Sequence, residues 1–301
     1  MNGLINILKP PNATSFDIVS FIRKKLNIKK VGHSGTLDPM AVGVLPICIG
    51  KGTKLINYMQ YDSKTYRCEL TLGANTDTQD IWGEVIEEFD TAHITDDMIV
   101  DTFKSFVGKQ TQIPPMYSAL KVNGRKLYEL AREGIEIERK PRDIQIYRLD
   151  IINIDKTRII FDAEVSKGTY IRTLCYDIGK TLNTGGFMSF LSRTECGVFS
   201  LENTVTVEEI MESTIDEIKE KYLIGLDYPI DDMPRVEIHP FAKRFLINGV
   251  PVKEQGILSK PDIKDNDLIR VYVDDEFYAI GKYRNNDKHQ GDIKVVTLFK
   301  N

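Results

Sequence analysis

The sequence predicts an α+β fold. Two stretches, residues 66–72 and 159–165, alternate apolar and polar residues as half-buried strands do. Other stretches, after Ser15 and after Tyr170, place apolar residues at helical spacing. Because these elements do not follow the strict strand–helix–strand rhythm of a doubly wound sheet, we expect a mixed, largely antiparallel sheet with flanking helices.

The first half of the chain carries signals for several elements in order. Thr14 or Ser15 can cap a helix whose apolar positions are Ile18, Val19, Ile22 and Leu26. Residues 40–49 have no charged side chain and predict an apolar strand or a buried connector. After the strand at 66–72, the stretch 73–83 is rich in Asn, Thr, Asp and Gly and predicts a loop. Thr95 then caps a helix that reaches about Val107 and stops at Gly108.

In the second half, a strand leads through a turn into a helix. The strand at 159–165 ends at Ser166-Lys167-Gly168, and helical spacing follows at Ile171, Leu174, Ile178 and Leu182. This order places Tyr170 and Arg172 in the first turn of the helix, where free backbone N–H groups can meet an anion. Residues 206–221 predict a further, acidic helix.

The pattern of predicted elements changes after Pro234. Short strands separated by polar turns are predicted at 268–273, 277–281 and 295–299. This tail is too short for a second enzyme domain and predicts a small β-barrel. We therefore expect one domain over 1–233 and a second over 234–301.

The bulk composition fits a globular protein. Hydrophobic residues make up 42% of the 301 residues and charged residues 28%. No apolar run approaches the ~20 residues that span a bilayer, and the first residues lack the basic-then-apolar form of a signal peptide. We expect a cytoplasmic protein with no membrane contact.

Charge is unevenly distributed along the chain. The net charge of −4 argues mildly against a polyanionic partner. Residues 84–101, however, carry seven acids and no Lys or Arg, whereas residues 21–30 carry five basic residues and no acid. One face can therefore be basic while the molecule is acidic. For residues 21–30 alone, a solvated helix flank explains the run equally well.

The cysteines and histidines do not suggest a metal site. The four cysteines include no C-x-x-C pair, and each has apolar neighbours, which indicates buried small hydrophobic residues rather than metal ligands or disulfides. The histidines are equally scattered, so we expect no structural or catalytic metal. These residues are Cys48, Cys68, Cys175, Cys196, His33, His93, His239 and His289.

Asp38 is the single carboxylate in residues 32–54. Five glycines and a run of small apolar residues share that stretch, a composition suited to close backbone approach and an isolated charge. Two interpretations are open. Asp38 can cap a helix that begins at Pro39, or it can be a catalytic nucleophile or general base at the edge of an apolar segment.

Other catalytic motifs are absent. A phosphate-binding loop at Gly50-Lys51 fails, because Leu45 stands where the motif needs glycine and Gly52 where it needs Ser or Thr. The sequence has neither a Gly-x-Ser-x-Gly elbow nor a His-Glu-x-x-His pair. Nucleotide hydrolysis by a phosphate loop, serine hydrolysis and zinc proteolysis therefore have no support.

The segment around Asp38 resembles a known signature. Gly32-His33-Ser34-Gly35-Thr36-Leu37-Asp38-Pro39, followed by Ala41, Gly43, Leu45, Pro46, Gly50 and Thr53-Lys54, is similar to the catalytic motif of the TruB family of bacterial tRNA pseudouridine synthases. The family's catalytic aspartate falls on Asp38. The resemblance implies the pseudouridine synthase fold followed by a small PUA-like RNA-binding module.

Further blocks resemble the same family in the same order. Lys9 to Ser15 is similar to its N-terminal motif, with Asn12 where the family usually has glycine; Asn can also adopt a left-handed backbone. A second block of the family is similar to Pro114 to Lys121 and to further residues as far as Arg142. Ser166 to Arg172 and Leu191-Ser192-Arg193 are similar to others, so the resemblance covers residues 3 to about 200.

The resemblance implies catalytic roles for three residues. Asp38 would be the nucleophile, and Arg172 would pair with it and keep it ionised. Tyr66 would stack on the flipped base and take part in proton transfer. Without the resemblance, Arg172 also fits a surface or phosphate-binding arginine, and Tyr66 a core aromatic.

It also implies contacts to the substrate. His33 would wedge into the RNA loop or contact the displaced base, and Tyr170 and Leu191 would enclose the uracil; each also fits a core or loop residue. Lys9, Lys121, Arg125, Lys126 and Arg193 are candidate phosphate contacts. In the tail, Lys243, Arg244, Lys282 and Arg284 suit contact with an RNA backbone.

The implied activity is the isomerisation of uridine 55 in the T-loop of tRNA to pseudouridine. We expect no cofactor, the tRNA T-arm as partner, and a monomer. One alternative is a guide-RNA-dependent relative, although Met40 to Pro46 looks like the bacterial stand-alone version. Another is an RNA chaperone that opens and refolds tRNA without chemistry.

Overall fold

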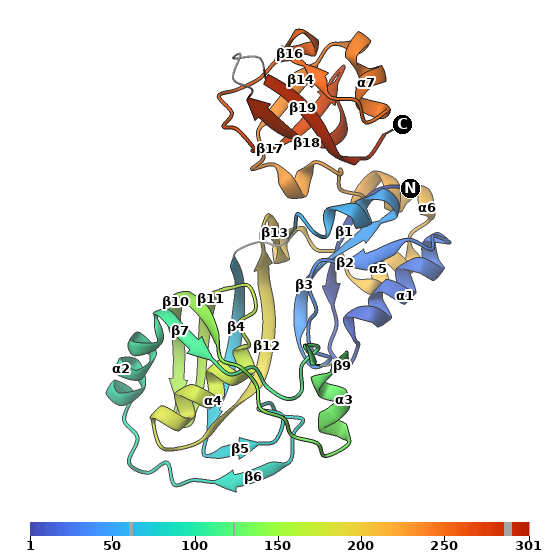
Figure 1. The fold of residues 1–301 in the computed structure, drawn as a ribbon. Helices are drawn as coiled ribbons and strands as arrows, with labels where there is room; N and C mark the ends of the chain where they lie inside the picture. Colours follow the sequence, from blue (N-terminus) through green and yellow to red (C-terminus); the bar gives the residue numbers. More distant parts are fainter. Residues whose placement is uncertain (60–62, 123, 286–290, 301) are drawn as a thin grey trace.

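Two separate β-sheets dominate the computed structural model, which describes residues 1–59, 63–122, 124–285 and 291–300 (Figure 1). The larger sheet has nine strands and the smaller has six. Helices flank the larger sheet, so the predicted α+β class is confirmed. His289 lies outside the described residues.

The larger sheet has the order β1-β3-β12-β4-β11-β10-β7, with β2 added to β3 and β13 to β12. Its strands are β1 (Gly3–Lys9), β2 (Val31–His33), β3 (Val42–Ile49), β4 (Ser63–Leu72), β7 (Gly108–Gln112), β10 (Arg142–Asp155), β11 (Arg158–Ser166), β12 (Gly186–Cys196) and β13 (Phe199–Ser200). Only the pairing of β3 with β12 is parallel among the described strands of this sheet, which is therefore mixed and largely antiparallel as predicted.

Two short hairpins lie outside both sheets. They pair β5 (Ala74–Thr76) with β6 (Val85–Glu88), and β8 (Lys121–Val122) with β9 (Arg125–Lys126). The first hairpin replaces part of the loop predicted at 73–83. Thr76 and Asp80 close the turn region through a hydrogen bond from the Thr76 hydroxyl to the Asp80 carbonyl, 2.8 Å.

The helices begin and end largely where capping signals predict. They are α1 (Ser15–Leu26), α2 (Asp96–Phe106), α3 (Leu127–Arg132), α4 (Ile171–Thr181), α5 (Val207–Glu212), α6 (Ile215–Glu217) and α7 (Lys243–Ile247), with short turns η1 (Gly50–Leu55), η2 (Leu201–Asn203), η3 (Ile218–Tyr222), η4 (Tyr228–Ile230), η5 (Pro240–Ala242) and η6 (Glu254–Gly256). Thr14 and Thr95 cap α1 and α2 through their side chains, as predicted.

The single acidic helix predicted over 206–221 is wrong. The chain breaks at Ser213, whose extended backbone separates α5 from α6. Thr206 caps α5 with Glu209, and Thr214 caps α6 with Glu217, each in a reciprocal capping box. Two complete start signals eight residues apart favour two short helices over one long helix.

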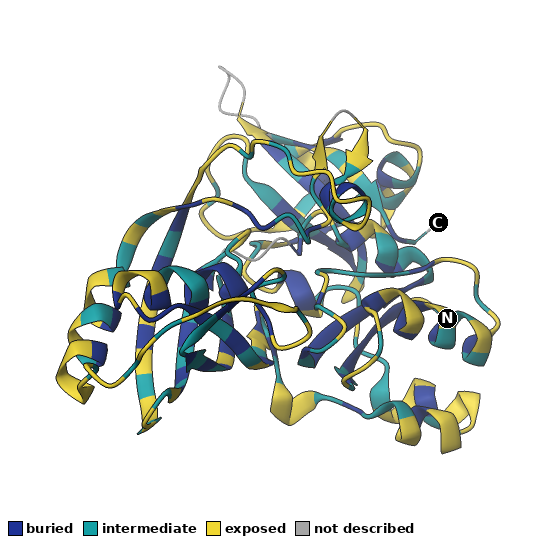
Figure 2. Ribbon diagram, turned by 90° about the horizontal axis from the view of Figure 1, so that it is seen from below, coloured by how far each residue is buried: buried dark blue, intermediate teal, exposed yellow. Residues whose placement is uncertain are grey.

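The larger sheet has two apolar cores, one for each group of helices. One core joins β4, β10, β11 and β12 to α2 and α4, with Phe103 packed edge-on against Phe161. The other joins β1 and β3 to α1 and α5. Buried residues accordingly gather on the strands and on the inner sides of the helices (Figure 2). The four cysteines are buried and free, as expected.

The smaller sheet has the order β15-β19-β18-β17-β14-β16 and curls into a barrel-like form. Its strands are β14 (Arg235–Ile238), β15 (Val252–Lys253), β16 (Ile257–Ser259), β17 (Leu268–Val273), β18 (Glu276–Asn285) and β19 (Gly291–Leu298). β17 matches its prediction, whereas β18 extends past the predicted 281 and β19 begins before 295. The domain boundary near Pro234 stays a prediction, and β14 begins one residue later.

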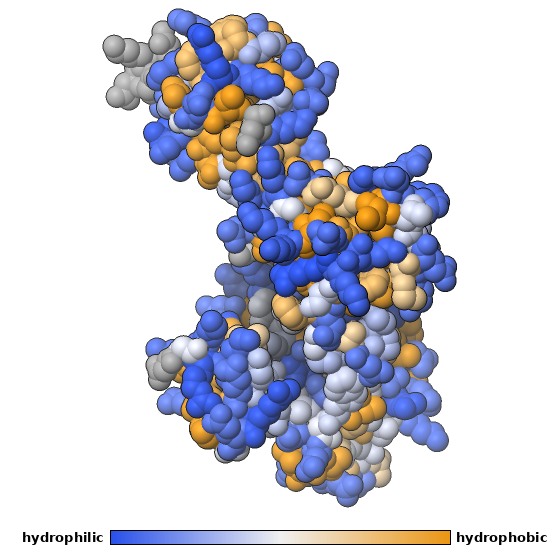
Figure 3. Space-filling view, turned by 90° about the vertical axis from the view of Figure 1, so that its right-hand side faces the viewer, coloured by the Kyte–Doolittle hydropathy of each residue, from blue (hydrophilic) through white to orange (hydrophobic). Residues whose placement is uncertain are grey.

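A shared apolar cluster joins the two sheets. Leu4 and Val44 of the larger sheet contribute to it, as do Ile280 and Phe299 from the C-terminal part. The hydroxyls of Tyr58 and Thr297 are 2.7 Å apart across the same junction. Figure 3 shows the C-terminal part as a rounded lobe joined to the rest by a narrower waist. Within the described ranges, no helix has the length and apolar character needed to cross a membrane.

Candidate active site

Asp38 lies in the loop between β2 and β3, where the chain approaches the first turn of α4. It starts no helix: Pro39 and Met40 form a tight turn, closed by a 3.0 Å hydrogen bond from the Ala41 N–H to the Asp38 carbonyl. The helix-cap interpretation is therefore wrong. Residues 42–49 form strand β3, which confirms the predicted apolar strand.

Backbone contacts fix this loop on both sides of Asp38. The Ser15 hydroxyl accepts a hydrogen bond from the Leu37 N–H (2.9 Å) and lies 3.2 Å from the Leu37 carbonyl. On the other side, the Lys9 ammonium donates to the carbonyls of Pro39 (3.2 Å) and Ala41 (2.7 Å). The main chain of Asp38 is thus held by the end of β1 and the start of α1.

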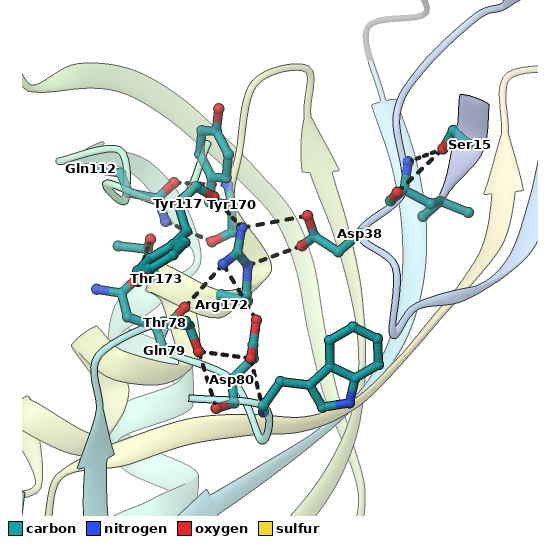
Figure 4. A network of polar contacts seen from close by, with 12 residues as sticks. Ser15, Asp38, Thr78, Gln79, Asp80, Gln112, Tyr117, Tyr170, Arg172 and Thr173 are labelled. Carbon is teal, nitrogen blue, oxygen red and sulfur yellow. Dashed lines mark hydrogen bonds and ion pairs between the residues drawn. The ribbon is translucent and has the colours of Figure 1, made fainter. Parts of the chain in front are cut away.

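Arg172 forms an ion pair with Asp38, with 2.9 Å between Nε and Oδ2. A second contact joins Nη2 to Oδ1 at 3.4 Å, while the Nε contact is not aligned as a hydrogen bond. The side chain of Arg172 is 5% exposed, and that of Asp38 is 36% exposed. The guanidinium is therefore buried behind the carboxylate, which stays open to a ligand on its other side (Figure 4).

Three other groups hold the guanidinium of Arg172. Nη1 donates to the Thr78 carbonyl (3.0 Å) and lies 3.4 Å from Oδ2 of Asp80. Nη2 donates to the Tyr117 carbonyl at 2.8 Å. Because Nη1 and Nη2 both donate hydrogen bonds to these groups, the arginine cannot leave Asp38 without breaking several buried hydrogen bonds.

Asp80 is a second, more deeply buried carboxylate on the far side of Arg172. Its Oδ1 accepts hydrogen bonds from the Thr78 hydroxyl (2.8 Å) and the Trp82 N–H (3.0 Å). Burial raises the pKa of Asp80, and the opposing effects of the Thr78 hydrogen bond and of Arg172 offset that rise only in part. Two carboxylates therefore share one guanidinium.

Tyr66 and Leu191 come from neighbouring strands of the larger sheet. Tyr66 on β4 pairs with Arg193 on β12, and Leu191 pairs with Cys68, so the alternation of strand side chains puts these four residues on one face. Both Tyr66 and Leu191 belong to the apolar core that also contains Leu37. Burial raises the pKa of the Tyr66 hydroxyl.

Tyr170 and His33, the other two predicted contacts to the base, lie at the start of α4 and at the end of β2. Tyr170 precedes α4 directly, and its backbone exchanges hydrogen bonds with the Gln112 side chain at 2.8 and 3.0 Å. His33 ends β2 and is partly buried, which lowers the pKa of its imidazole. Among the described residues, no cluster of three or more His, Cys, Asp or Glu side chains has the arrangement of a metal site.

Family models match most of the chain. A model described as the N-terminal domain of TruB family pseudouridylate synthases matches residues 23–171, and one described as the C-terminal domain of tRNA pseudouridylate synthase B matches residues 172–233. The chain belongs to the TruB family. The predicted resemblance is therefore confirmed.

Proteins named tRNA pseudouridine synthase B are similar to this TruB chain over nearly its full length. Those of Alkaliphilus oremlandii and Clostridium tetani are each 47% identical over 299 residues, covering 99% of this chain and 99% and 100% of their own. Among solved structures, one of a Cbf5–Nop10–Gar1 complex is similar with a TM-score of 0.75 and 29% identity, covering 99% of this chain and 85% of that one.

Two of the predicted phosphate contacts do not fit the structure. Lys9 and Arg193 are both 0% exposed. The Lys9 ammonium donates to the carbonyls of Pro10, Pro39 and Ala41, and burial lowers its pKa to about 8. Both residues therefore support the site from within, because neither side chain reaches the surface where RNA would bind.

The other predicted basic residues do lie at the surface. Lys121 and Arg125 are exposed on the β8–β9 hairpin, and Lys126 is half-buried beside Tyr128, 3.1 Å from its hydroxyl. In the C-terminal part, Arg244 on α7 and Arg284 on β18 are exposed. Their contacts with RNA stay predictions.

Sequence reasoning missed Asp80 and the two carbonyls that hold Arg172 in this TruB chain. Asp80 falls in the stretch 73–83, whose polar composition is typical of loops. Tyr117 lies in a block that resembles the family, but its contribution is a backbone carbonyl, which every residue has. Only the spacing of Thr78 and Asp80 in a short turn hinted at a structured loop.

Proposed function

We propose that this protein isomerises uridine 55 in the T-loop of tRNA to pseudouridine, with Asp38 as the nucleophile. The observation that supports this most is the ion pair of the half-exposed Asp38 with the buried Arg172 at 2.9 Å. A paired guanidinium favours the ionised carboxylate, the form that attacks. The names of the relatives at 47% identity support tRNA as the substrate.

The reaction needs one carboxylate and a site that holds a free base. The glycosidic bond breaks, the uracil turns while it stays bound, and carbon 5 joins C1′ of the ribose. Asp38 would carry the covalent intermediate. Tyr66 would stack on the base, Tyr170 and Leu191 would enclose it, and His33 would fill the place that the base leaves. No step requires a cofactor.

The target base lies inside a folded loop, so it has to flip out of the RNA stack. Extrusion costs a few kcal/mol, which contacts to the rest of the T-arm have to offset. RNA shape would dominate recognition, with contacts to the exposed Lys121 and Arg125 on the β8–β9 hairpin. We expect the protein to act as a monomer.

A guide-RNA-dependent activity is the nearest alternative. It is favoured by the likeness to a chain of an H/ACA ribonucleoprotein bound to a substrate RNA, at 26% identity and 85% coverage of that chain. The proteins named tRNA pseudouridine synthase B are more similar in sequence, and this chain covers 99% or more of the first two. The stand-alone tRNA enzyme is therefore the better-supported proposal.

The test is to incubate an unmodified tRNA transcript with the protein alone and to map pseudouridine by base-specific chemical labelling. We expect one product, at position 55, and none in a control transcript with cytidine at that position. A protein that binds and refolds tRNA but gives no product would be a chaperone, and the proposal would be wrong. Product only in the presence of a guide RNA would favour the alternative.

A further inference from the structure

Arg193 is a fully buried arginine next to the candidate site. It lies on β12 at 0% exposure. Its Nε donates to the Val44 carbonyl on β3 at 2.8 Å, and Nη2 donates to the Gly35 carbonyl, three residues before Asp38, at 3.3 Å. The guanidinium thus connects two strands and the loop that carries Asp38.

This buried charge has no carboxylate partner in the part of the chain that the structure describes. Both of its hydrogen-bond acceptors are neutral carbonyls, and Nη1 is buried without a hydrogen-bond partner. A buried, uncompensated guanidinium is costly, so an anionic partner that forms beside it would be stabilised. Arg193 therefore has capacity for one further, anionic acceptor.

Tyr66 lies directly opposite Arg193 in the sheet, and its hydroxyl can become an anion. It pairs with Arg193 across β4 and β12, so both side chains stand on the same face. Burial raises the pKa of the Tyr66 hydroxyl, and the positive charge of Arg193 opposes that effect. The arginine thus favours the phenolate form of this tyrosine.

Other charged groups around the pair do not replace Arg193 in this role. Asp38 and Cys196 disfavour the phenolate of Tyr66. His33, Lys64 and Lys9 lie within the electrostatic reach of Arg193 from β2, β4 and β1, and each has its pKa lowered, first by burial. Arg172 is committed to Asp38 and Asp80.

We propose that Arg193 is a positioning residue that stabilises the phenolate of Tyr66 during proton transfer. Its Nη1 donates to the phenolate as its missing partner, while Val44 and Gly35 hold the guanidinium in place. The proposal rests on the proposed function and deepens it, because it assigns the proton-transfer step to a pair of residues.

This step needs no other reactant, because Tyr66 gives one proton and takes one back. Once carbon 5 has joined C1′, carbon 5 still carries its hydrogen and N1 lacks one. The Tyr66 hydroxyl gives its proton to N1, directly or through water, and becomes a phenolate beside Arg193. The phenolate then takes the proton from carbon 5, which restores the C5–C6 double bond and the neutral tyrosine.

The first test is a titration that requires no activity. With ¹³C-labelled tyrosine, the NMR signal of Tyr66 is assigned by its loss in Tyr66→Phe and followed with pH. In Arg193→Gln the phenol pKa should rise by roughly one unit or more, and Arg193→Lys, which keeps the charge, should fall in between. An unchanged pKa in a folded Arg193→Gln protein overturns the proposal.

A second measurement leaves Arg193 in place, which covers the case that its variants do not fold. In ¹⁵N-arginine protein, one guanidinium signal should shift with the titration of Tyr66 and stay fixed in Tyr66→Phe. If no guanidinium signal follows Tyr66, the two groups do not interact and the proposal is wrong.

The third test separates proton transfer from structural damage. With tRNA deuterated at uridine carbon 5, the kinetic isotope effect should be larger for Arg193→Gln than for the wild type, because removal of that proton becomes slower. In the Tyr66→Phe background the isotope effect should no longer depend on Arg193. A lower rate with an unchanged isotope effect means a structural role and overturns the proposal. Absence of product from the wild-type protein is a failure of the proposed function, which the titrations do not share.

Discussion

At the scale of residues, one guanidinium determines how the candidate site works. Arg172 lies between Asp38, which is half-exposed, and Asp80, which is buried. The difference in exposure gives the two carboxylates different tasks. Asp38 can reach a substrate, whereas Asp80 can only act on Arg172.

The substitution Asp38→Asn tests the nucleophile. We expect it to reduce single-turnover pseudouridine formation by at least ~10³, since an amide cannot form the covalent intermediate. The affinity for tRNA should stay within about tenfold, because the turn at Asp38 is closed by backbone groups. Asp101→Asn, at an exposed position on α2, is the matched control. Near-normal activity of the Asp38 variant would contradict the assignment.

The substitution Asp80→Asn tests the second carboxylate. The amide can keep the hydrogen bonds from Thr78 and Trp82, but it presents no charge to Arg172. We expect the single-turnover rate to fall by about tenfold or more, as for loss of a charged hydrogen bond. Glu84→Gln, an exposed change in the same hairpin, should have little effect. If both variants react alike, Asp80 does not position Arg172.

At the scale of elements, α4 carries both Arg172 and a partly buried carboxyl group that opposes folding. Burial raises the pKa of Asp177 from 3.8 to about 6, partly offset by Lys180. Between these values the folded state binds a proton that the unfolded state has released. This carboxyl therefore lowers stability progressively between pH 3.8 and about 6, and the full loss applies above pH 6.

Asp177→Asn should remove that loss. We expect the free energy of unfolding at pH 7.5 to rise by about 1 kcal/mol, after allowance for solvent screening. The gain should shrink as the pH falls below 6 and vanish near pH 3.5. Urea unfolding at several pH values measures it. A gain that does not depend on pH would mean that the carboxyl charge is not its cause.

The parallel pairing of β3 with β12 depends on Gly43. Its φ is +110°, and a Cβ there would lie 2.2 Å from the Arg193 carbonyl oxygen. Gly43→Ala should therefore cost about 3 kcal/mol or more in urea unfolding. Gly134→Ala is the control, with positive φ but open space around it, and should cost only about 1 kcal/mol. Equal costs would show that crowding at β12 is unimportant.

Features that depend on local sequence signals could be predicted, whereas features that depend on tertiary packing could not. β4 and α4 were predictable, because period and capping are local, and Asn12 does adopt positive φ. Asp38 and Arg172 were named through a resemblance to a family. Lys9 and Arg193 were assigned to the surface, where long cations normally lie, because only tertiary packing reveals that they are buried.

At the scale of the whole molecule, the net charge of −4 has to be reconciled with an RNA partner. The acidic run 84–101 includes β6 and the start of α2, whereas the candidate RNA contacts lie on the β8–β9 hairpin, on α7 and on β18. Segregation of this kind allows a basic contact face on an acidic protein.

Affinity for tRNA should therefore fall steeply with salt. We expect the dissociation constant to rise at least about tenfold between 50 and 200 mM NaCl, through release of counterions. Replacing Lys121 and Arg125 with Gln should reduce the slope of log Kd against log salt by roughly one for each phosphate that is no longer neutralised. Replacing Lys104 and Lys156, which lie outside the proposed face, is the control. A flat salt response would contradict a basic RNA-binding face.

The apolar cluster between the two sheets also affects the order in which the protein can fold during its synthesis. Leu4 lies on β1, and its cluster partner Phe299 is synthesised almost three hundred residues later. Until that residue emerges, the nascent β1 and β3 expose part of their apolar surface. The larger sheet therefore reaches its final burial only after the C-terminal part has been synthesised, and contacts this distant in sequence make for slow folding.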